Sequence, residues 1–196
     1  MEDNTVDDNK VIVWMQTSLD GRTSGPGGEF DWPVIGDELH THFVTTLAGA
    51  GMFCYGRHVF EMMASFWPIA DELPDSTPNQ AAYARIWRPM PKVVLSRTLE
   101  GAEWNTTLVH DVDGFSEAAR SSAGDVYVFG GASTVAALAE RDLVDEYHVF
   151  VHPVVLGGGT ELFAPDSRRR AMELRGSRTF DERVVELHYA RSGDSA

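Results

Sequence analysis

Three features are scarce in this chain: cysteine, positive charge and long apolar runs. Cys54 is the only cysteine among 196 residues, which excludes an intramolecular disulfide and a zinc site built from several cysteines. Its position within the apolar segment 52–55 predicts a buried, inert thiol. No apolar run approaches the roughly 18 residues that a membrane-spanning helix needs. We therefore expect neither a membrane partner nor a resident metal.

The chain carries 16 basic and 30 acidic residues, for a net charge of -14. This balance argues against non-specific nucleic-acid binding, which needs a basic surface. An anionic ligand would depend on a few arginines focused in one place. Residues 1–10 are acidic and polar and do not resemble a signal peptide, so we expect a disordered tail there and a cytoplasmic protein.

Short apolar segments alternate with helical patterns, which predicts a single α/β domain over residues 11–191. The early alternation implies a mostly parallel sheet, and the last two strands, with no helix between them, imply an antiparallel C-terminal edge. The fold class expected is a three-layer α/β domain with a mixed sheet. The predicted strands are 11–15, 51–55, 92–96, 107–110, 125–129, 145–152, 172–180 and 184–190, and the predicted helices are 37–48, 59–67, 115–122 and 133–141.

Two polar segments are predicted to be loops. The first, residues 16–36, is long and glycine-rich, and loops of this length inside a compact domain are often functional. Its part 24–32 holds three glycines and could close over a ligand as a lid. The second loop covers residues 71–79.

The segment after the strand 125–129 is the first candidate ligand site. Gly130 and Gly131 let the backbone approach a ligand closely, and the helix that follows offers free N–H groups and a positive dipole end to a phosphate. Ser133 and Thr134 could add hydroxyls. The alternative is a tight turn with a serine cap. The pattern is not the G-x-G-x-x-G motif of standard dinucleotide-binding folds.

Two other strands end in similar ways, one at Gly56-Arg57 and one at Ser96-Arg97. Arginine suits phosphate because its guanidinium donates two parallel hydrogen bonds. Ligands of parallel sheets bind at the carboxyl ends of the strands. A single arginine is more often a solvated surface residue, but three such strand ends together predict a ligand with several phosphates.

These three strand ends resemble the NADPH contacts of the dihydrofolate reductase fold. Other segments are similar to the C-terminal reductase domain of the bifunctional riboflavin biosynthesis deaminase/reductase, and the resemblance extends from about residue 11 to residue 190. The segments are Ser18-Leu19-Asp20-Gly21, Phe66-Trp67-Pro68, residues 91–99, Leu143-Val144-Asp145-Glu146 and residues 152–159, with Pro153-Val154-Val155-Leu156-Gly157-Gly158-Gly159 among the most specific. The zinc site of the deaminase partner needs several cysteines, so with Cys54 alone we expect a reductase-type domain without deaminase activity.

The resemblance implies NADPH as the cofactor, with Arg57 near its 2′-phosphate. One charge-assisted hydrogen bond there is worth roughly 1.5–3 kcal/mol, which favours NADPH over NADH by about tenfold to a hundredfold. One departure is Val59, where the family usually has a threonine. The cofactor-binding residues implied are Gly56, Arg57, Ser96, Arg97, Gly130, Gly131, Ala132, Ser133 and Thr134.

On the substrate side, Asp37 follows Trp32 by five residues at a predicted helix start. In dihydrofolate reductases a carboxylate at this position holds the pterin, so the resemblance makes Asp37 a candidate catalytic acid, with Glu38 as second choice. The alternative is that Asp37 only stabilises the helix N-terminus. Asp20 is the other catalytic candidate, or else it sets a turn. Trp32 and Phe43 are candidate substrate-binding residues, or else packing residues.

The expected function is an NADPH-dependent reductase that transfers a hydride to a small heterocyclic substrate, pterin- or pyrimidine-like. The alternatives are a nucleotide-binding module of the same fold without turnover, and a flavin-using reductase. The resemblance also implies a homodimer, with the strand 148–153 and the triple-glycine turn at the interface.

Overall fold

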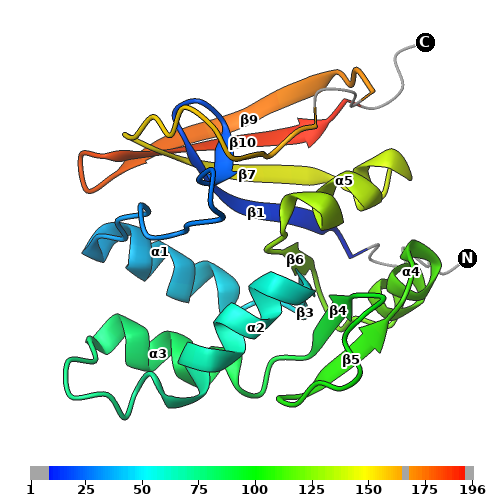
Figure 1. The fold of residues 1–196 in the computed structure, drawn as a ribbon, viewed down its shortest axis with the longest axis horizontal. Helices are drawn as coiled ribbons and strands as arrows, with labels where there is room; N and C mark the ends of the chain where they lie inside the picture. Colours follow the sequence, from blue (N-terminus) through cyan, green and yellow to red (C-terminus); the bar gives the residue numbers. More distant parts are fainter. Residues whose placement is uncertain (1–8, 165–167, 193–196) are drawn as a thin grey trace, which may run out of the picture.

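The computed structural model describes residues 9–164 and 168–192, which form an eight-stranded sheet and, among the described residues, five α-helices (Figure 1). The strand order is β5-β4-β3-β6-β1-β7-β10-β9. The strands of the sheet are β1 (Val11–Ser18), β3 (Met52–Gly56), β4 (Lys92–Leu95), β5 (Thr106–Val109), β6 (Val126–Val128), β7 (Glu146–His152), β9 (Met172–Phe180) and β10 (Val184–Arg191). The helices are α1 (Asp37–Leu47), α2 (Arg57–Phe66), α3 (Pro78–Trp87), α4 (Val112–Arg120) and α5 (Ala132–Glu140).

The six strands from β5 to β7 pair in parallel, and β10 pairs antiparallel with both β7 and β9. This confirms the expected mixed, mostly parallel sheet with an antiparallel C-terminal edge. All six parallel strands therefore end at the same edge of the sheet. No helix in the described part of the chain is both long and apolar enough to cross a membrane.

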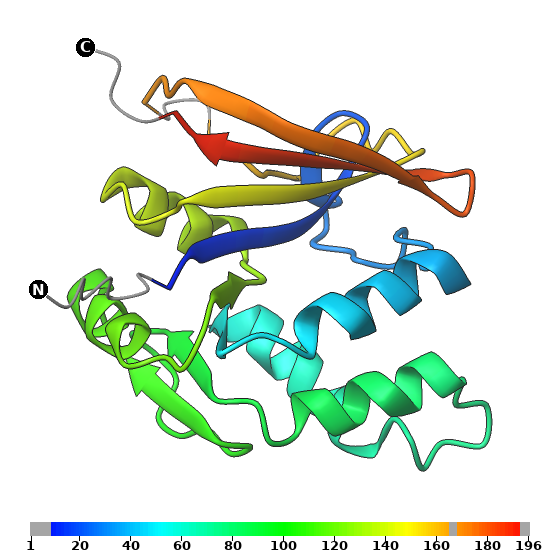
Figure 2. The same cartoon turned by 180° about the vertical axis from the view of Figure 1, so that it is seen from behind.

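Alternate residues of each strand point to opposite sides of the sheet, and in β1 the residues on both sides are apolar. Helices therefore cover both faces of the sheet. On β1, Ile12 and Trp14 join a core cluster with residues of α1, α2 and α3. Val11, Val13 and Met15 join a second cluster with residues of α4 and α5. Figures 1 and 2 show α1 and α3 side by side at one end of the molecule, with α4 and α5 toward the other.

The pattern missed α3 and placed the start of α2 too late. Thr77 caps α3 by accepting a hydrogen bond from the Gln80 backbone, the Gln80 side chain accepts one in return, and Pro78 occupies the first turn. The expected loop 71–79 therefore ends earlier than predicted. Helix α2 begins at Arg57, directly after Gly56, and not at Val59. Since Gly56 is the last residue of β3, strand and helix join without a linker.

The predicted loop 16–36 is also shorter than expected, because β1 continues to Ser18 and residues 22–24 form a strand. This strand, β2 (Arg22–Ser24), pairs antiparallel with β8 (Thr160–Glu161) in a separate two-stranded ribbon. The ribbon follows the carboxyl end of β1, and its pairing with β8 holds residues 22–24 in place.

The start of α1 is held by the hairpin turn between β9 and β10. The carboxylate of Asp181 accepts hydrogen bonds from the N–H groups of Glu38 (3.0 Å) and Leu39 (3.1 Å). The Glu38 carboxylate accepts one from the N–H of Asp181 (2.7 Å). The helix N-terminus is thus capped from a residue far along the chain.

Residues 1–8 of the expected acidic tail lie outside the described residues, so disorder there stays a prediction. The two remaining residues of that segment are bonded to the domain. The Asn9 side chain donates to the Ser122 carbonyl (2.6 Å), and the Lys10 ammonium donates to the Glu146 carboxylate (2.7 Å).

Candidate functional site

The carboxyl ends of β3 and β6 meet at a contact between glycines. The N–H of Gly56 donates to the carbonyl of Gly130 (2.5 Å). A Cβ on Gly56 would lie 2.6 Å from Oγ1 of Thr134, and a Cβ on Gly130 would lie 2.7 Å from the Met15 sulfur. Gly130 also has a φ of +87°, in the region that favours glycine. Larger side chains would push the two strand ends apart.

This contact places the N-termini of α2 and α5 beside each other. Gly56 is the N-cap of α2 and Gly131 is the N-cap of α5, and the peptide bond from Gly130 to Gly131 is cis. Neither cap has a side chain to accept the first-turn N–H groups, and Ser133, the predicted cap, is exposed. A Cβ on Gly131 would meet only Val59 Cγ2, at 3.9 Å. The positive end of α5 therefore has room beside it among the described residues, which suits an anion.

The predicted arginines lie at the same edge of the sheet. Arg57 is the first residue of α2, and its guanidinium, 39% exposed, lies 3.7 Å from the Glu61 carboxylate. On the next strand end, the Ser96 hydroxyl is buried and accepts hydrogen bonds from the N–H groups of Thr98 and Leu99. Arg97 is exposed. Ser96 thus shapes the turn that presents Arg97.

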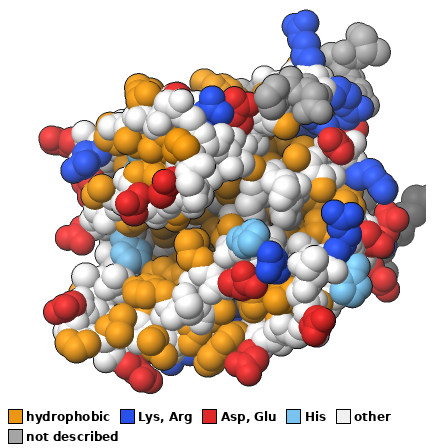
Figure 3. Space-filling view, viewed as in Figure 1, with side chains coloured by type: hydrophobic (Ala, Val, Ile, Leu, Met, Phe, Trp, Pro, Cys, Tyr) orange, Lys and Arg blue, Asp and Glu red, His pale blue; other side chains and the backbone are white. Residues whose placement is uncertain are grey.

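A groove of about 380 Å³ adjoins the start of α5. One wall is the first turn of α5 with Ala132 and Ser133, and the other is the β2–β8 ribbon with Arg22, Gly159 and Thr160. Figure 3 shows a hollow with hydrophobic side chains on the face of the molecule that carries α2. The groove therefore begins at the first turn of α5, directly after Gly131.

Asp20 occupies the turn after β1 and connects it to the turn after β7. Its carboxylate accepts hydrogen bonds from the Ser18 hydroxyl (2.7 Å) and from the N–H groups of Leu156 (3.1 Å) and Gly157 (2.9 Å). The Ser18 bond first, and then these backbone bonds, lower the pKa of Asp20 to about 2. A carboxylate this acidic is ionised at neutral pH and suits positioning of the two turns better than proton donation.

Trp32, a predicted substrate residue, lies at the carboxyl ends of β1 and β7. Its ring packs edge-on against His152, with centroids 5.5 Å apart. The His152 Nε2 lies 2.5 Å from Gln16 Oε1. Nε1 of Trp32 and Nδ1 of His152 are buried, and neither has a hydrogen-bond partner among the described residues. Two buried polar atoms at this edge of the sheet are thus without partners, which is uncommon in folded proteins.

We call the group of Gln16, Trp32 and His152 the corner. Burial in this corner keeps His152 neutral. Burial, reinforced by the positive charge of Arg183, lowers the pKa of His152 to about 4. The imidazole is almost fully buried, with 1% exposed. At neutral pH it therefore offers one donor and one acceptor nitrogen.

Gln16 and His152 were missed as site residues by the sequence analysis, although a signal for them existed. Both lie near the carboxyl ends of parallel strands, β1 and β7, which is the criterion that selected Arg57 and Arg97. His152 was considered only as part of a turn motif. Applying the strand-end criterion to every parallel strand would have included both residues.

The structure separates the other two substrate candidates from this corner. Phe43 packs edge-on against Trp14 and Phe150 in the core. Asp37 is exposed and lines a different groove, of about 470 Å³, with His42 of α1 and Arg178 of β9. Because Asp181 takes over the capping of α1, the Asp37 carboxylate is not used as the cap of its helix.

Solved structures with the same fold are found among reductases. A Shewanella sp. PV-4 protein provisionally assigned to riboflavin biosynthesis superposes with a TM-score of 0.72 at 24% identity, covering 94% of this chain and 99% of its own. A Thermotoga maritima deaminase/reductase for pyrimidine ribosylamines gives 0.67 at 13% identity, over 95% of this chain and 57% of that one. Enterococcus faecalis dihydrofolate reductase, complexed with NADP(H), gives 0.66 at 15% identity, over 95% and 98%.

Sequence comparisons agree with the fold. Two uncharacterised proteins of Bacillus subtilis strain 168 match along nearly their whole length: YyaP is 27% identical, covering 97% of this chain and 99% of its own, and YwjB is 25% identical, covering 94% and 99%. The model of the RibD C-terminal domain matches residues 9–186. This chain belongs to the RibD C-terminal domain family.

Proposed function

We propose that this chain is an NADPH-dependent reductase that transfers a hydride to a small pterin- or pyrimidine-like ring. The observation that carries the proposal is the pair of glycine-capped helix N-termini at Gly56 and Gly130-Gly131. Family membership supports the reductase class. When bound, the reduced nicotinamide supplies the hydride, and the protein supplies binding, orientation and a polar environment.

The residues at the junction fit a dinucleotide with several phosphates. The first-turn N–H groups of α5, at Ala132 and Ser133, and the space above Gly131 suit a pyrophosphate. Arg57 and Arg97 at neighbouring strand ends suit a further phosphate. Gly56 and Thr134 act by keeping the two helix ends together, since they are in close contact.

The corner of Gln16, Trp32 and His152 suits the substrate ring. The unpaired Trp32 N–H is a donor, and the unpaired His152 nitrogen adds an acceptor when Nε2 carries the proton. Because both atoms are buried in this structure, a heterocycle with ring nitrogens and carbonyls satisfies them only after Trp32 moves away from His152. Asp37 is kept as the proposed acid that holds the substrate on the strength of the resemblance alone, since its carboxylate lines a different groove, with Arg178. Asp20 is proposed to position the loop beside the nicotinamide.

A nucleotide-binding module without turnover is the second candidate, and Val59 is the observation that favours it. Val59 lies in the first turn of α2, 3.9 Å from the Cβ position of Gly131, where its relatives are expected to carry a hydroxyl. Saturable NADPH binding without oxidation in the presence of any ring substrate would support this candidate over the reductase.

We also propose that the chain forms a homodimer. Leu19 and Val155 are 67% and 65% exposed on turns joined by a hydrogen bond from the Leu19 N–H to the Val154 carbonyl (2.8 Å). Alternate side chains of β7, among them His148 and His152, already make polar contacts with other residues of the same chain. An interface would therefore use these exposed turns and not that face of β7.

Arg57→Ala is expected to weaken NADPH binding about tenfold to a hundredfold, because one charge-assisted contact to the 2′-phosphate is lost. The affinity for NADH should change little. Nicotinamide fluorescence titrations measure both constants, and thermal melts check that the variant is folded. Arg175→Ala is the matched control, since Arg175 is also exposed and paired with one nearby carboxylate, Glu173. Equal NADPH affinity in Arg57→Ala and wild type would refute the placement of the phosphate.

Asp37→Asn is expected to lose turnover and to keep NADPH binding, because only the substrate contact changes. The assay follows NADPH oxidation with dihydrofolate and with a pyrimidine ribosylamine as acceptors. Asp75→Asn, in the exposed loop before α3, is the control for a lost surface charge. Unchanged turnover in Asp37→Asn would leave Asp37 as a surface acid at a helix start.

The low pKa of His152 predicts a pH-dependent stability. The unfolded chain binds the proton near pH 6.5, whereas the folded chain binds it only near pH 4, so stability falls as the pH drops through this interval. Between pH 7 and pH 5 this residue should account for a loss of about 2 kcal/mol.

Urea unfolding at the two pH values measures this loss. His152→Gln should show a smaller decrease than wild type, whereas His58→Gln, at an exposed position, should match wild type. An equal decrease in wild type and His152→Gln would show that His152 is not held neutral.

A further inference from the structure

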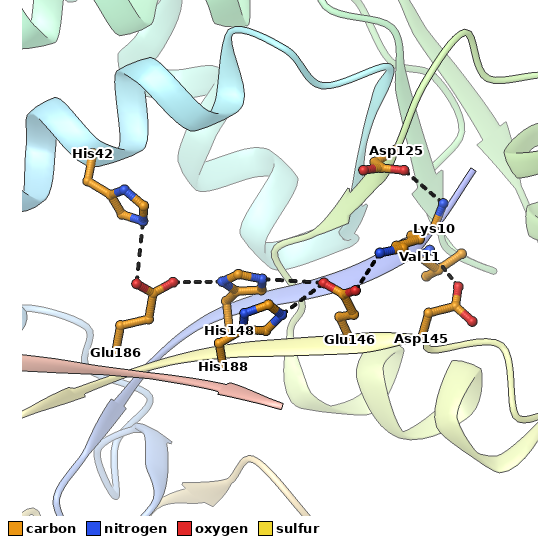
Figure 4. Close-up of polar contacts among 9 residues, drawn as sticks. All are labelled: Lys10, Val11, His42, Asp125, Asp145, Glu146, His148, Glu186 and His188. Carbon is orange, nitrogen blue, oxygen red and sulfur yellow. Dashed lines mark hydrogen bonds and ion pairs between the residues drawn. The ribbon is translucent and has the colours of Figure 1, made fainter. Parts of the chain in front are cut away.

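A cluster of imidazoles and carboxylates lies on the face of the sheet that α1 covers, away from the junction of helix ends (Figure 4). Its members come from β7, β10, α1 and the segment before β1. They are Glu146, His148, Glu186, His188, His42 and Lys10.

The pairing of β7 with β10 creates the centre of the cluster. His148 lies directly opposite His188 in the antiparallel register, and their rings stack with centroids 3.9 Å apart. Glu146, two residues before His148, points to the same face. Its Oε2 lies 2.9 Å from Nε2 of His188 and 3.7 Å from Nε2 of His148. Three donor atoms thus converge from two adjacent strands (Figure 4).

Glu186 fixes which nitrogen of His148 faces this centre. Its Oε1 lies 2.6 Å from Nδ1 of His148, so that nitrogen carries the proton and Nε2 presents its lone pair toward Glu146. A carboxylate behind a histidine is the usual outer contact of a metal-binding imidazole. The Lys10 ammonium, 2.7 Å from Oε1 of Glu146, holds that carboxylate with its other oxygen toward the histidines.

The charge and exposure of the cluster also suit a cation. With neutral imidazoles, Glu146 and Glu186 outweigh the charge of Lys10 by one negative charge. The side chains of Glu146 and His148 are only 14% and 15% exposed, and that of His188 is 28% exposed. These three side chains are thus largely shielded from water, and the partly exposed His188 ring is where an ion could enter.

We propose that Glu146, His148 and His188 bind one zinc ion, with a fourth position open to solvent. Zinc bonds of 2.0–2.2 Å in a tetrahedron separate the donor atoms by about 3.3 Å, and the two observed separations of 2.9 Å and 3.7 Å lie on either side of this value. Binding displaces the proton that Nε2 of His188 donates to Glu146, and it requires the stacked rings to turn apart about their Cβ–Cγ bonds, which leaves the strand pairing unchanged.

The three proposed ligands lie away from the junction of helix ends and from His152, whereas His42, at the border of the cluster, also lines the groove with Asp37. His148 precedes His152 by four residues on β7, which is about 13 Å along a strand. An ion held by both β7 and β10 would cross-link the antiparallel edge of the sheet. Through the pairing of Glu186 with His42 (3.6 Å) it would also stabilise the position of α1.

The test is a zinc titration of tag-free, chelator-treated full-length protein against a chromophoric competitor, together with thermal melts. Wild type should bind one equivalent of zinc with micromolar or tighter affinity, and zinc should raise its melting temperature. Cobalt(II) in place of zinc should give the visible absorption of a four- or five-coordinate ion.

Two variants assign the binding to this cluster. His188→Gln should abolish zinc binding, and Glu186→Gln should weaken it about 10- to 100-fold through the outer contact. His58→Gln is the matched control, because His58 is exposed and also lies near a glutamate, Glu61. Circular dichroism without zinc verifies that each variant is folded.

Two results would overturn the proposal: no zinc binding by folded wild type, or zinc affinity in folded His188→Gln equal to that of wild type and His58→Gln. Neither result would affect the proposed reductase function, because NADPH binding is measured separately and at a different edge of the sheet.

Discussion

The close approach of β3 and β6 at Gly56 and Gly130 is the constraint on which the site depends. The hydrogen bond between them brings two strand ends, and hence the starts of α2 and α5, into contact. No other residue fits at Gly56 without displacing Thr134. Because each helix follows its strand with almost no linker, the positions of the free N–H groups are set by the sheet itself. Binding geometry here is thus a property of the scaffold and not of a mobile loop.

The same constraint would let a chain with a net charge of -14 receive the anionic cofactor that we propose. Helix dipoles and backbone N–H groups are fixed partial charges that the overall balance of side chains does not remove. Arg57 and Arg97 then add full charges at one edge only. Glu61, 3.7 Å from Arg57, lowers the local positive potential, so the proposed attraction depends on the helix ends of the junction as well as on the arginines.

The sequence predicted the parts of the fold that depend on local patterns. Apolar strands that end in glycine or arginine predicted which strand ends meet at one edge of the parallel sheet. Features that depend on contacts between distant segments could not be predicted: Asp181 caps α1 from 143 residues away, and the pairing of His148 with His188 follows from strand register. Helix α3 was missed although its capping residues are visible in the sequence, because they sit in a polar, proline-bearing stretch.

The most direct test of the central claim is a nicotinamide fluorescence titration of the wild-type protein with NADPH and with NADH. The account predicts saturable, micromolar binding of NADPH and binding of NADH that is weaker by about tenfold or more. If neither nucleotide binds, the junction of helix ends is not a cofactor site in this protein, and only the fold it shares with the reductases remains.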